Sequence, residues 1–425
     1  MKKNEPDTTQ HVSRRSLLGG AATAAVALVQ NAFAKGWPAT SVQIGILEAE
    51  RAVLDDPTRV PGLPPGEVGT RSAFEKLVKK PSDISSRSPL QDFHGIITPS
   101  DLHFERHHNG VPTVDPARYE LTIHGLVHRP TVFSLADLKR FPSVSRIAFL
   151  ECSGNFRTGK ETMSPQDIAG LTSQSEWTGV KLSTLFREVG VKPSATWFLA
   201  EGGDAARMTR SIPVQKGLDD AIIAYAQNGE ALRPEQGYPV RLFLPGWEGN
   251  MSVKWLRRLE LGDAPWHTRE ETSKYTEPVR APGGGPGKIR QFSFVMDARS
   301  LITYPAYPVQ VERGWIEIRG LAWSGRGKVV RVEVSTDAGR SWKVTELQQP
   351  VLDKAHVRFR HFWRWDGAET EICSRVTDET GYTQPTLKQL MDARGPDTGG
   401  YHLNPITPWV LKTDGRVLHK PQNWR

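Results

Sequence analysis

The order of hydrophobic and polar residues between positions 100 and 265 predicts a body that mixes strands with helices. Helical spacing predicts one helix through Leu135, Leu138 and Phe141, begun by a cap at Ser134, and a second helix at 182–189 that Gly190 ends. Alternating or continuous apolar runs predict strands at residues 119–123, 147–150, 197–200 and 240–244. Helices and strands in this irregular order indicate an α+β domain.

After residue 287 the pattern changes to short alternating segments. These predict strands at residues 315–319, 330–334, 342–344 and 372–376, separated by turns at 337–339 and 378–381. Short strands separated by such turns are typical of a β-sandwich. The Gly- and Pro-rich stretch 281–287 is the predicted linker. We therefore expect an α+β domain at residues 100–280 and an immunoglobulin-like β-sandwich at 288–425.

The first 34 residues have the pattern of an export signal. Arg14 and Arg15 precede a short apolar run, and residues 32–34 form a small-x-small cleavage signature. The paired arginines resemble a twin-arginine signal, so we expect a periplasmic protein that is exported folded. The apolar run is shorter than the roughly 20 residues that a membrane span needs. Residues 35–99 are rich in Pro, Gly and Ser, and we expect an irregular arm lying on a neighbour or on a second subunit.

Composition narrows the classes of protein further. A chain of 425 residues suffices for two ordinary domains, and 38% hydrophobic with 24% charged residues is typical of a globular protein. The net charge is +8, but no long Lys/Arg run accompanies it, which argues against nucleic-acid binding. The two cysteines, Cys152 and Cys373, are too few for a disulfide scaffold, a CxxC zinc site, an iron–sulfur cluster or a covalently attached haem.

Cys152 follows the predicted buried strand at 147–150, where a loop on a rigid platform exposes its side chains. Cys152 has two possible interpretations: it is a small buried hydrophobic residue, or it is a thiolate that acts as a nucleophile or as a soft metal ligand. One thiolate does not hold a metal firmly, so a metal there needs further ligands from a cofactor. A cysteine hydrolase would instead need a histidine near Cys152. Cys373 lies inside an alternating strand and is predicted to be structural.

Two further clusters carry candidate chemistry. Residues 103–108 combine three histidines with Arg106, which permits a zinc site, a solvated polar loop or an anion site. The bidentate fork of an arginine favours the anion. Arg241 and Lys254 flank a Pro/Gly loop at 245–249, and basic groups beside such a loop can hold a phosphate.

Taken together, these stretches resemble the sulfite oxidase family of molybdenum enzymes. The residues that carry the resemblance are Phe104–His108, Glu151–Asn155, Glu201–Asp204, Gly237–Arg241, Ser252–Trp255 and Tyr275. Residues 334–342 look like part of the dimerisation domain of that family. The blocks at 95–110, 233–250 and 269–275 look closer still to one branch, the molybdenum subunit of the bacterial sulfur-oxidation (Sox) system.

The resemblance implies a role for each matching residue. Cys152 would ligate molybdenum, with the two dithiolene sulfurs of molybdopterin as further ligands. The oxyanion pocket would be lined by Arg106, Arg157, Trp177 and Tyr275. The pterin and its phosphate would be bound by Phe104, Glu105, Arg106, His107, His108, Asp204, Gln236, Arg241, Ser252, Val253 and Lys254. At position 236, where this chain has Gln236, the family often has histidine. Residues 161–170 form an extra stretch relative to the family.

The resemblance also implies partners. The haem-binding domain of the family is absent and the chain has no cysteine pair for haem, so electrons would leave to a separate c-type cytochrome. A homodimer through the C-terminal domain is expected. The substrate would be free sulfite or a sulfane sulfur on a carrier protein. The alternative class of function is an exported, non-catalytic β-sandwich binding protein.

Overall fold

The computed structural model describes residues 62–280, 288–395 and 400–422. The chain divides into two compact units, residues 1–75 and 76–425. The described part of the first unit, residues 62–75, contains neither helix nor strand. The elements described below all belong to the second unit. The predicted export signal and the predicted linker at 281–287 lie outside the described residues.

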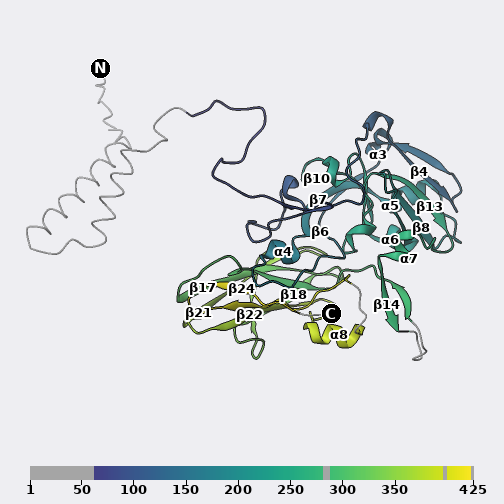
Figure 1. Cartoon of the computed structure of the whole chain (residues 1–425). Helices are drawn as coiled ribbons and strands as arrows, with labels where there is room; N and C mark the ends of the chain where they lie inside the picture. Colours follow the sequence, from purple (N-terminus) through teal and green to yellow (C-terminus); the bar gives the residue numbers. More distant parts are fainter. Residues whose placement is uncertain (1–61, 281–287, 396–399, 423–425) are drawn as a thin grey trace, which may run out of the picture. The chain divides into compact units, whose positions relative to one another are not determined.

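An antiparallel sheet of five strands carries the Cys152 segment (Figure 1). Its strands β11, β10, β7 and β6 are adjacent in that order, and β12 pairs with β10. The bounds are β6 (Ser143–Glu151), β7 (Thr172–Lys181), β10 (Ile222–Gln227), β11 (Glu230–Ala231) and β12 (Arg241–Phe243). The predicted strand at 147–150 is thus the second half of β6, and it ends immediately before Cys152.

A second sheet has the order β5-β4-β13-β8-β9, in which only the β4–β13 pairing is parallel. Its strands are β4 (Glu120–Gly125), β5 (Thr131–Ser134), β8 (Trp197–Gly202), β9 (Thr209–Pro213) and β13 (Leu256–Gly262). One apolar cluster joins both sheets, with Ile123 from β4, Phe198 from β8 and Leu242 from β12 fully buried in it. This shared core makes the two sheets one α+β body.

The predicted helices form at the positions that the capping and stop residues in the sequence indicate. The Ser134 hydroxyl accepts a hydrogen bond from the Asp137 N–H, and the Asp137 carboxylate accepts one from the Ser134 N–H; this capping box begins α3 (Leu135–Arg140). Helix α5 (Leu182–Val189) buries Leu182, Leu185, Phe186 and Val189 on one face. It ends at Gly190, whose φ of +67° suits a residue without a Cβ. Helices α6 (Val214–Asp219), α4 (Pro165–Ala169) and α7 (Arg269–Ser273) are shorter.

Residues 76–99, which we predicted to be irregular, contain two short strands. β1 (Lys80–Pro81) and β2 (Ser85–Arg87) form a sheet with β3 (Glu105–Arg106). The segment continues along the body of the same chain, where Leu90 and Phe93 are buried. Backbone hydrogen bonds to neighbouring segments stabilise what the local sequence alone leaves without regular structure.

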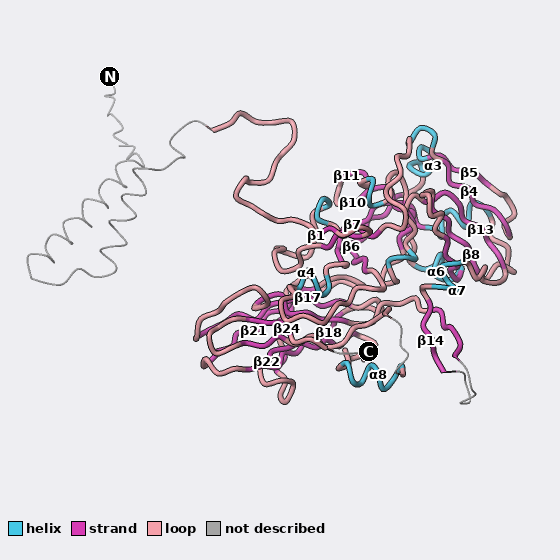
Figure 2. The backbone as a smooth tube through the Cα atoms, in the orientation of Figure 1, coloured by secondary structure: helices cyan, strands magenta, loops and turns pink. Residues whose placement is uncertain are grey.

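The C-terminal part is a β-sandwich, as the alternating pattern predicted (Figure 2). Its sheets have the orders β16-β17-β21-β20 and β19-β18-β22-β23-β24. The first consists of β16 (Arg299–Tyr304), β17 (Gly314–Trp323), β20 (Glu346–Leu347) and β21 (Val357–Trp365). The second consists of β18 (Val329–Ser335), β19 (Lys343–Val344), β22 (Thr370–Asp378), β23 (Trp409–Leu411) and β24 (Val417–His419). Trp323 and Trp409 are fully buried in the core cluster of this region.

Three further elements lie in the described chain. β14 (Thr276–Arg280) and β15 (Lys288–Phe292) pair antiparallel on either side of the predicted linker. α8 (Leu387–Arg394) lies beside the sandwich strands (Figure 2) and begins with a capping box between Thr386 and Gln389. Among the helices that the structure describes, none has the length and apolar character of a membrane span.

Candidate functional site

Segments that lie far apart in the sequence meet in one pocket beside Cys152. The pocket has about 660 Å³ of empty volume, which includes space open to solvent. Of the residues proposed from the sequence, it is lined by Phe104, Arg106, His107, His108, Cys152, Asp204, Gln236, Arg241, Ser252, Val253, Lys254 and Tyr275. Arginine, lysine and histidine side chains face one acidic group, Asp204, so the pocket suits an anionic ligand.

Cys152 is positioned by the end of β6 and by a hydrogen bond from its N–H to the Leu171 carbonyl (3.0 Å). Burial raises the pKa of the Cys152 thiol, and the nearby charges of Arg106 and Arg87 oppose this rise. A thiol in this setting is protonated at neutral pH, whereas coordination to a metal deprotonates a thiol outright. Within the described ranges no histidine hydrogen-bonds to the sulfur, so the structure shows no imidazole–thiol pair of the kind that a cysteine hydrolase uses.

Lys254 fixes the segment of residues 104–108 against the pocket. Its ammonium group donates to the carbonyls of Arg106 (3.2 Å) and Glu235 (3.0 Å) and contacts His107 Nδ1 at 2.8 Å. Burial lowers the pKa of Lys254 well below its usual value, and the Arg241 charge adds to the effect. Gln236 supports the same segment, because its Nε2 donates to the Phe104 carbonyl at 2.9 Å.

Arg241 is a fully buried cation without a carboxylate partner in the described chain. Its two terminal nitrogens donate to the carbonyls of Gln236 (3.0 Å) and Ser252 (2.9 Å), and its Nε has no acceptor among the residues that the structure describes. Burial lowers the pKa of Arg241 to about 9, so the group is still charged at neutral pH. A buried charge with neutral partners and an unused donor suits a phosphate-bearing ligand.

Tyr275 faces the pocket from the residue before β14. Its hydroxyl lies 2.9 Å from His108 Nε2, and its ring lies 5.3 Å from that of Tyr401. Burial raises the pKa of the Tyr275 phenol, so it remains a proton donor at neutral pH. Burial and the Arg106 charge lower the pKa of His108 to about 4, which keeps the imidazole neutral. The pair thus presents a hydrogen-bond donor rather than a second charge.

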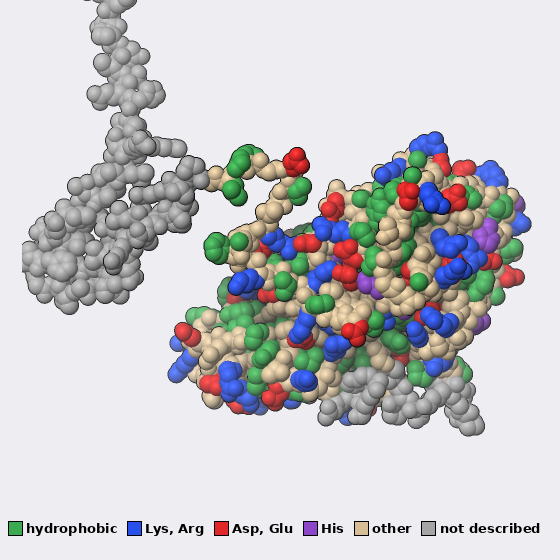
Figure 3. Space-filling view, turned by 45° about the horizontal axis from the view of Figure 1, so that its top comes forward, with side chains coloured by type: hydrophobic (Ala, Val, Ile, Leu, Met, Phe, Trp, Pro, Cys, Tyr) green, Lys and Arg blue, Asp and Glu red, His purple; other side chains and the backbone are tan. Residues whose placement is uncertain are grey.

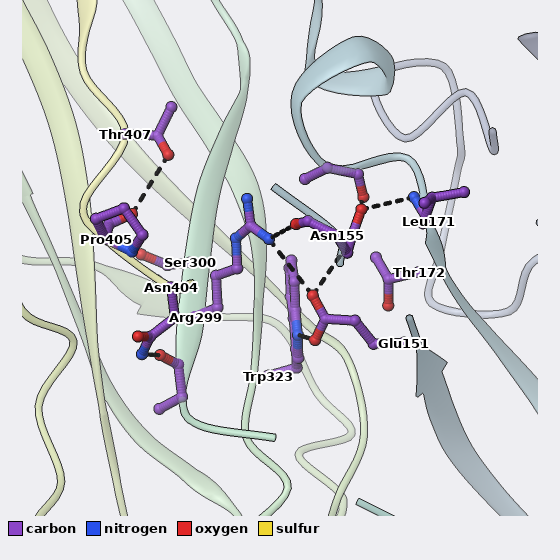
Figure 4. A network of polar contacts seen from close by, with 12 residues as sticks. Glu151, Asn155, Leu171, Thr172, Arg299, Ser300, Trp323, Asn404, Pro405 and Thr407 are labelled. Carbon is purple, nitrogen blue, oxygen red and sulfur yellow. Dashed lines mark hydrogen bonds and ion pairs between the residues drawn. The ribbon is translucent and has the colours of Figure 1, made fainter. Parts of the chain in front are cut away.

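A buried polar network connects the Cys152 loop to the sandwich (Figure 4). The Glu151 carboxylate accepts hydrogen bonds from Asn155 Nδ2 (2.9 Å) and from Trp323 Nε1 (2.6 Å), and lies 3.4 Å from Arg299 Nη1. Arg299 also donates to the Asn155 carbonyl. Because Glu151 immediately precedes Cys152, the network determines where β6 delivers the thiol.

Three residues proposed from the sequence do not line the pocket. Glu105 lies beside it and binds Lys79 and His107. Trp177 is fully buried on β7, where it stacks on Phe243 at 4.7 Å and lies under the Arg241 guanidinium. Arg157 is exposed, and its N–H donates to the Ile168 carbonyl. The strand pleat turns Trp177 into the core, and the extra stretch at 161–170 brings α4 against the Arg157 backbone.

Other members of the site were given no role from the sequence. The pocket is also lined by Leu150, Met208, Gly249, Asn250 and Trp255. Arg210, fully buried, donates to Asn250 Oδ1 (2.6 Å) and lies over the ring of Tyr275. The block at 245–249 was a signal for the Gly249–Asn250 step, whereas nothing in the local pattern distinguished Met208 or Arg210.

The residues present fit a cofactor that brings its own metal ligands. In the described ranges no three His, Cys, Asp or Glu side chains lie close enough together to hold a metal ion. A metal at Cys152 therefore needs other donors, and soft sulfur donors match a soft thiolate. The pocket beside the thiol, with buried Arg241 and its unused Nε, fits the phosphate-bearing pterin that would carry those sulfurs.

Comparisons with known proteins identify both parts of the chain. Residues 108–270 match the oxidoreductase molybdopterin binding domain, and residues 290–408 match the Mo-co oxidoreductase dimerisation domain. The sulfite oxidase of Gallus gallus is 30% identical over 84% of this chain and 80% of its own length. The nitrate reductase of Ulva prolifera is 31% identical over 72% of this chain, which spans only 40% of that enzyme.

Among solved structures, the sulfane dehydrogenase SoxCD of Paracoccus pantotrophus matches with a TM-score of 0.79 and 41% identity. The match covers 84% of this chain and 94% of that one. The expected fold, a sulfite-oxidase-type domain followed by a β-rich dimerisation domain, is confirmed, as is molybdopterin as the cofactor. The chain belongs to the sulfite oxidase family of molybdopterin-dependent oxidoreductases.

Proposed function

We propose that this chain oxidises sulfur, taking either free sulfite or a sulfane sulfur bound to a carrier protein, and passes the electrons to a separate c-type cytochrome. The observation that carries the proposal is the meeting of Cys152, Arg106 and Tyr275 in one pocket with buried Arg241. A soft metal ligand, a cation and a neutral donor stand together there. Oxygen transfer to an anionic sulfur compound requires these three kinds of group, to hold the metal and to bind the substrate.

Bound molybdenum would supply the two-electron redox chemistry, and the chain's own residues would hold the group and its substrate. Cys152 would ligate the metal. Arg241 would hold the phosphate of the pterin, with Gln236 and Lys254 keeping the 104–108 segment in place through their hydrogen bonds. Of the remaining pterin contacts we propose Phe104, Glu105, His107, His108, Asp204, Ser252 and Val253.

Arg106 and Tyr275 would bind the substrate. Sulfite is an anion near neutral pH, and Arg106 supplies a positive charge at the pocket wall. The Tyr275 phenol, which stays protonated, would donate to a substrate oxygen while His108 orients its hydroxyl. Arg157 and Trp177 would act from outside the pocket wall, Trp177 through the Arg241 guanidinium above it.

Several features support the proposed partners. The match to the structure of a sulfane dehydrogenase favours carrier-bound sulfane over free sulfite. The chain has two cysteines at distant positions, so the electron acceptor would be a separate protein. On the face shown in Figure 3, Lys and Arg side chains are interspersed with Asp and Glu, which suits a protein partner better than nucleic acid. We further propose a homodimer through the C-terminal domain and a periplasmic location after twin-arginine export.

The test uses purified holoprotein with measured molybdenum content. About one molybdenum per chain, with sulfite- or persulfide-dependent reduction of cytochrome c, is the expected result. Activity with a persulfide on a small carrier peptide, compared with activity on sulfite, distinguishes the two sulfur substrates. Nitrate is assayed as the alternative substrate. Protein that holds molybdenum but reduces only nitrate would refute sulfur oxidation. Protein without molybdenum or pterin would instead favour the exported, non-catalytic binding protein.

A further inference from the structure

Arg87 is a buried guanidinium for which the described chain offers no hydrogen-bond acceptor. It is the last residue of β2 and is only 5% exposed, and its Nη1 is buried without a partner. The fully buried arginines elsewhere each donate to at least one acceptor: Arg210, Arg241 and Arg299. An unpaired charge at such depth destabilises a fold strongly. A missing anion therefore accounts for Arg87 better than a structural role.

The backbone places Arg87 next to the Cys152 loop. Ser88 N–H donates to the Gly170 carbonyl (2.8 Å), and Cys152 N–H donates to the Leu171 carbonyl (3.0 Å). The backbones of Ser88 and Cys152 are therefore bound to two consecutive carbonyls, those of residues 170 and 171. Gly170 and Arg87 lie in close contact, because a Cβ on Gly170 would be 2.9 Å from the Cβ of Arg87.

Positive charge accumulates around residues 170–171. Burial and the neighbouring Arg157 charge lower the pKa of Arg87 to about 10, so the group stays cationic at neutral pH. Asp167 is a nearby carboxylate, yet it accepts its side-chain hydrogen bonds from Lys80 and Ser164. Arg106 lies on β3, the strand that pairs with β2. Like charges held together without an acidic partner are typical of anion sites.

We propose that Arg87 is a further substrate-binding residue, whose guanidinium holds the oxygens of a sulfur oxyanion beside Cys152. Its backbone bonds to the same 170–171 segment as Cys152, and it is not among the residues that line the pocket described above, so this subsite is separate from the pterin-binding residues. The proposal deepens the proposed function and rests on it. The ligand chemistry is that of sulfite, sulfate or a sulfonate, and sulfate is the probe.

The decisive variant is Arg87→Met, which keeps a flexible, unbranched apolar stem and removes the charge. We expect the Kd for sulfate, measured by calorimetry on holoprotein, and the KM for sulfite to rise by about 10- to 150-fold, the value of one charge-assisted hydrogen bond. The melting temperature should stay equal or rise, because an unpaired buried charge is removed. Arg87→Lys should recover part of the affinity, and exposed Arg118→Met should change nothing.

The opposite pattern would overturn the proposal. If Arg87→Met melts far below the wild type, or does not fold, while sulfate affinity in Arg87→Lys is unchanged, then Arg87 is a structural cation. Wild-type protein that binds no sulfate also overturns it. Wild-type protein that binds sulfate through Arg87 but oxidises no sulfur compound refutes the proposed function alone, so the two failures are distinguishable.

Discussion

The Glu151 carboxylate accepts a 2.6 Å hydrogen bond from Trp323 Nε1, although Glu151 ends β6 of the α+β body and Trp323 ends β17 of the sandwich. Both side chains are fully buried. Since Glu151 precedes Cys152, the sandwich helps to hold the loop that presents the thiol (Figure 4). The C-terminal domain is thereby part of the site's support as well as an expected dimer surface.

Trp323→Phe should lower the free energy of unfolding by about 1–3 kcal/mol, because it leaves a buried carboxylate oxygen without its donor. Chemical denaturation of holoprotein measures this loss. Trp315→Phe is the matched control, since Trp315 lies on the same strand and is 74% exposed. Equal losses in both variants would mean that the Glu151 bond contributes nothing specific.

Arg241→Met should lower pterin retention far more than it lowers the stability of the cofactor-free protein. Without the cofactor, Arg241 contributes its two hydrogen bonds to the Gln236 and Ser252 carbonyls, whereas its buried charge gains an anionic partner only when the phosphate is bound. Pterin released from purified protein reports retention, and thermal melting of cofactor-free protein reports stability. Full pterin content in Arg241→Met would rule out the phosphate contact.

Cys152→Ser should abolish turnover and lower the molybdenum content, because a hydroxyl is a poor substitute for a soft thiolate ligand. Cys373→Ser is the control. Cys373 is buried in β22 of the sandwich, where burial raises the pKa of its thiol to about 12, and its loss should leave turnover per molybdenum unchanged. Elemental analysis and a cytochrome c assay give both quantities. An active Cys152→Ser protein would contradict ligation.

Glu105 should make stability depend on pH in the acid range. Its hydrogen bond with His107, supported by Lys79, lowers the pKa of Glu105 from 4.5 to about 2 against the effect of burial. A carboxylate whose pKa falls on folding stabilises the protein above its unfolded pKa and loses that contribution as the pH falls towards the folded pKa. The stability gap between wild type and Glu105→Gln should therefore be full above pH 5 and shrink towards pH 2.

Denaturant midpoints at successive pH values test this, with exposed Glu120→Gln as the control. A gap between wild type and Glu105→Gln that is the same at pH 3 and pH 7 would show that Glu105 contributes through packing alone.

Local patterns in the sequence determined the elements and most of the site. The cap at Ser134, the stop at Gly190 and the apolar run that ends at Cys152 all appear where they were expected, because each depends on residues within a few positions. The resemblance named twelve of the residues that line the pocket. It could not place Arg157 and Trp177, since a strand pleat and the added helix α4 decide where those side chains point.

The tertiary structure alone decided the partnerships between distant residues. The Glu151–Trp323 bond joins positions 172 residues apart, and the unpaired charge of Arg87 is visible only once burial and hydrogen bonds are known. Hydrophobic periodicity reports which face of an element is buried, but it does not report which polar group lies opposite. That information exists only after the chain has brought its segments together.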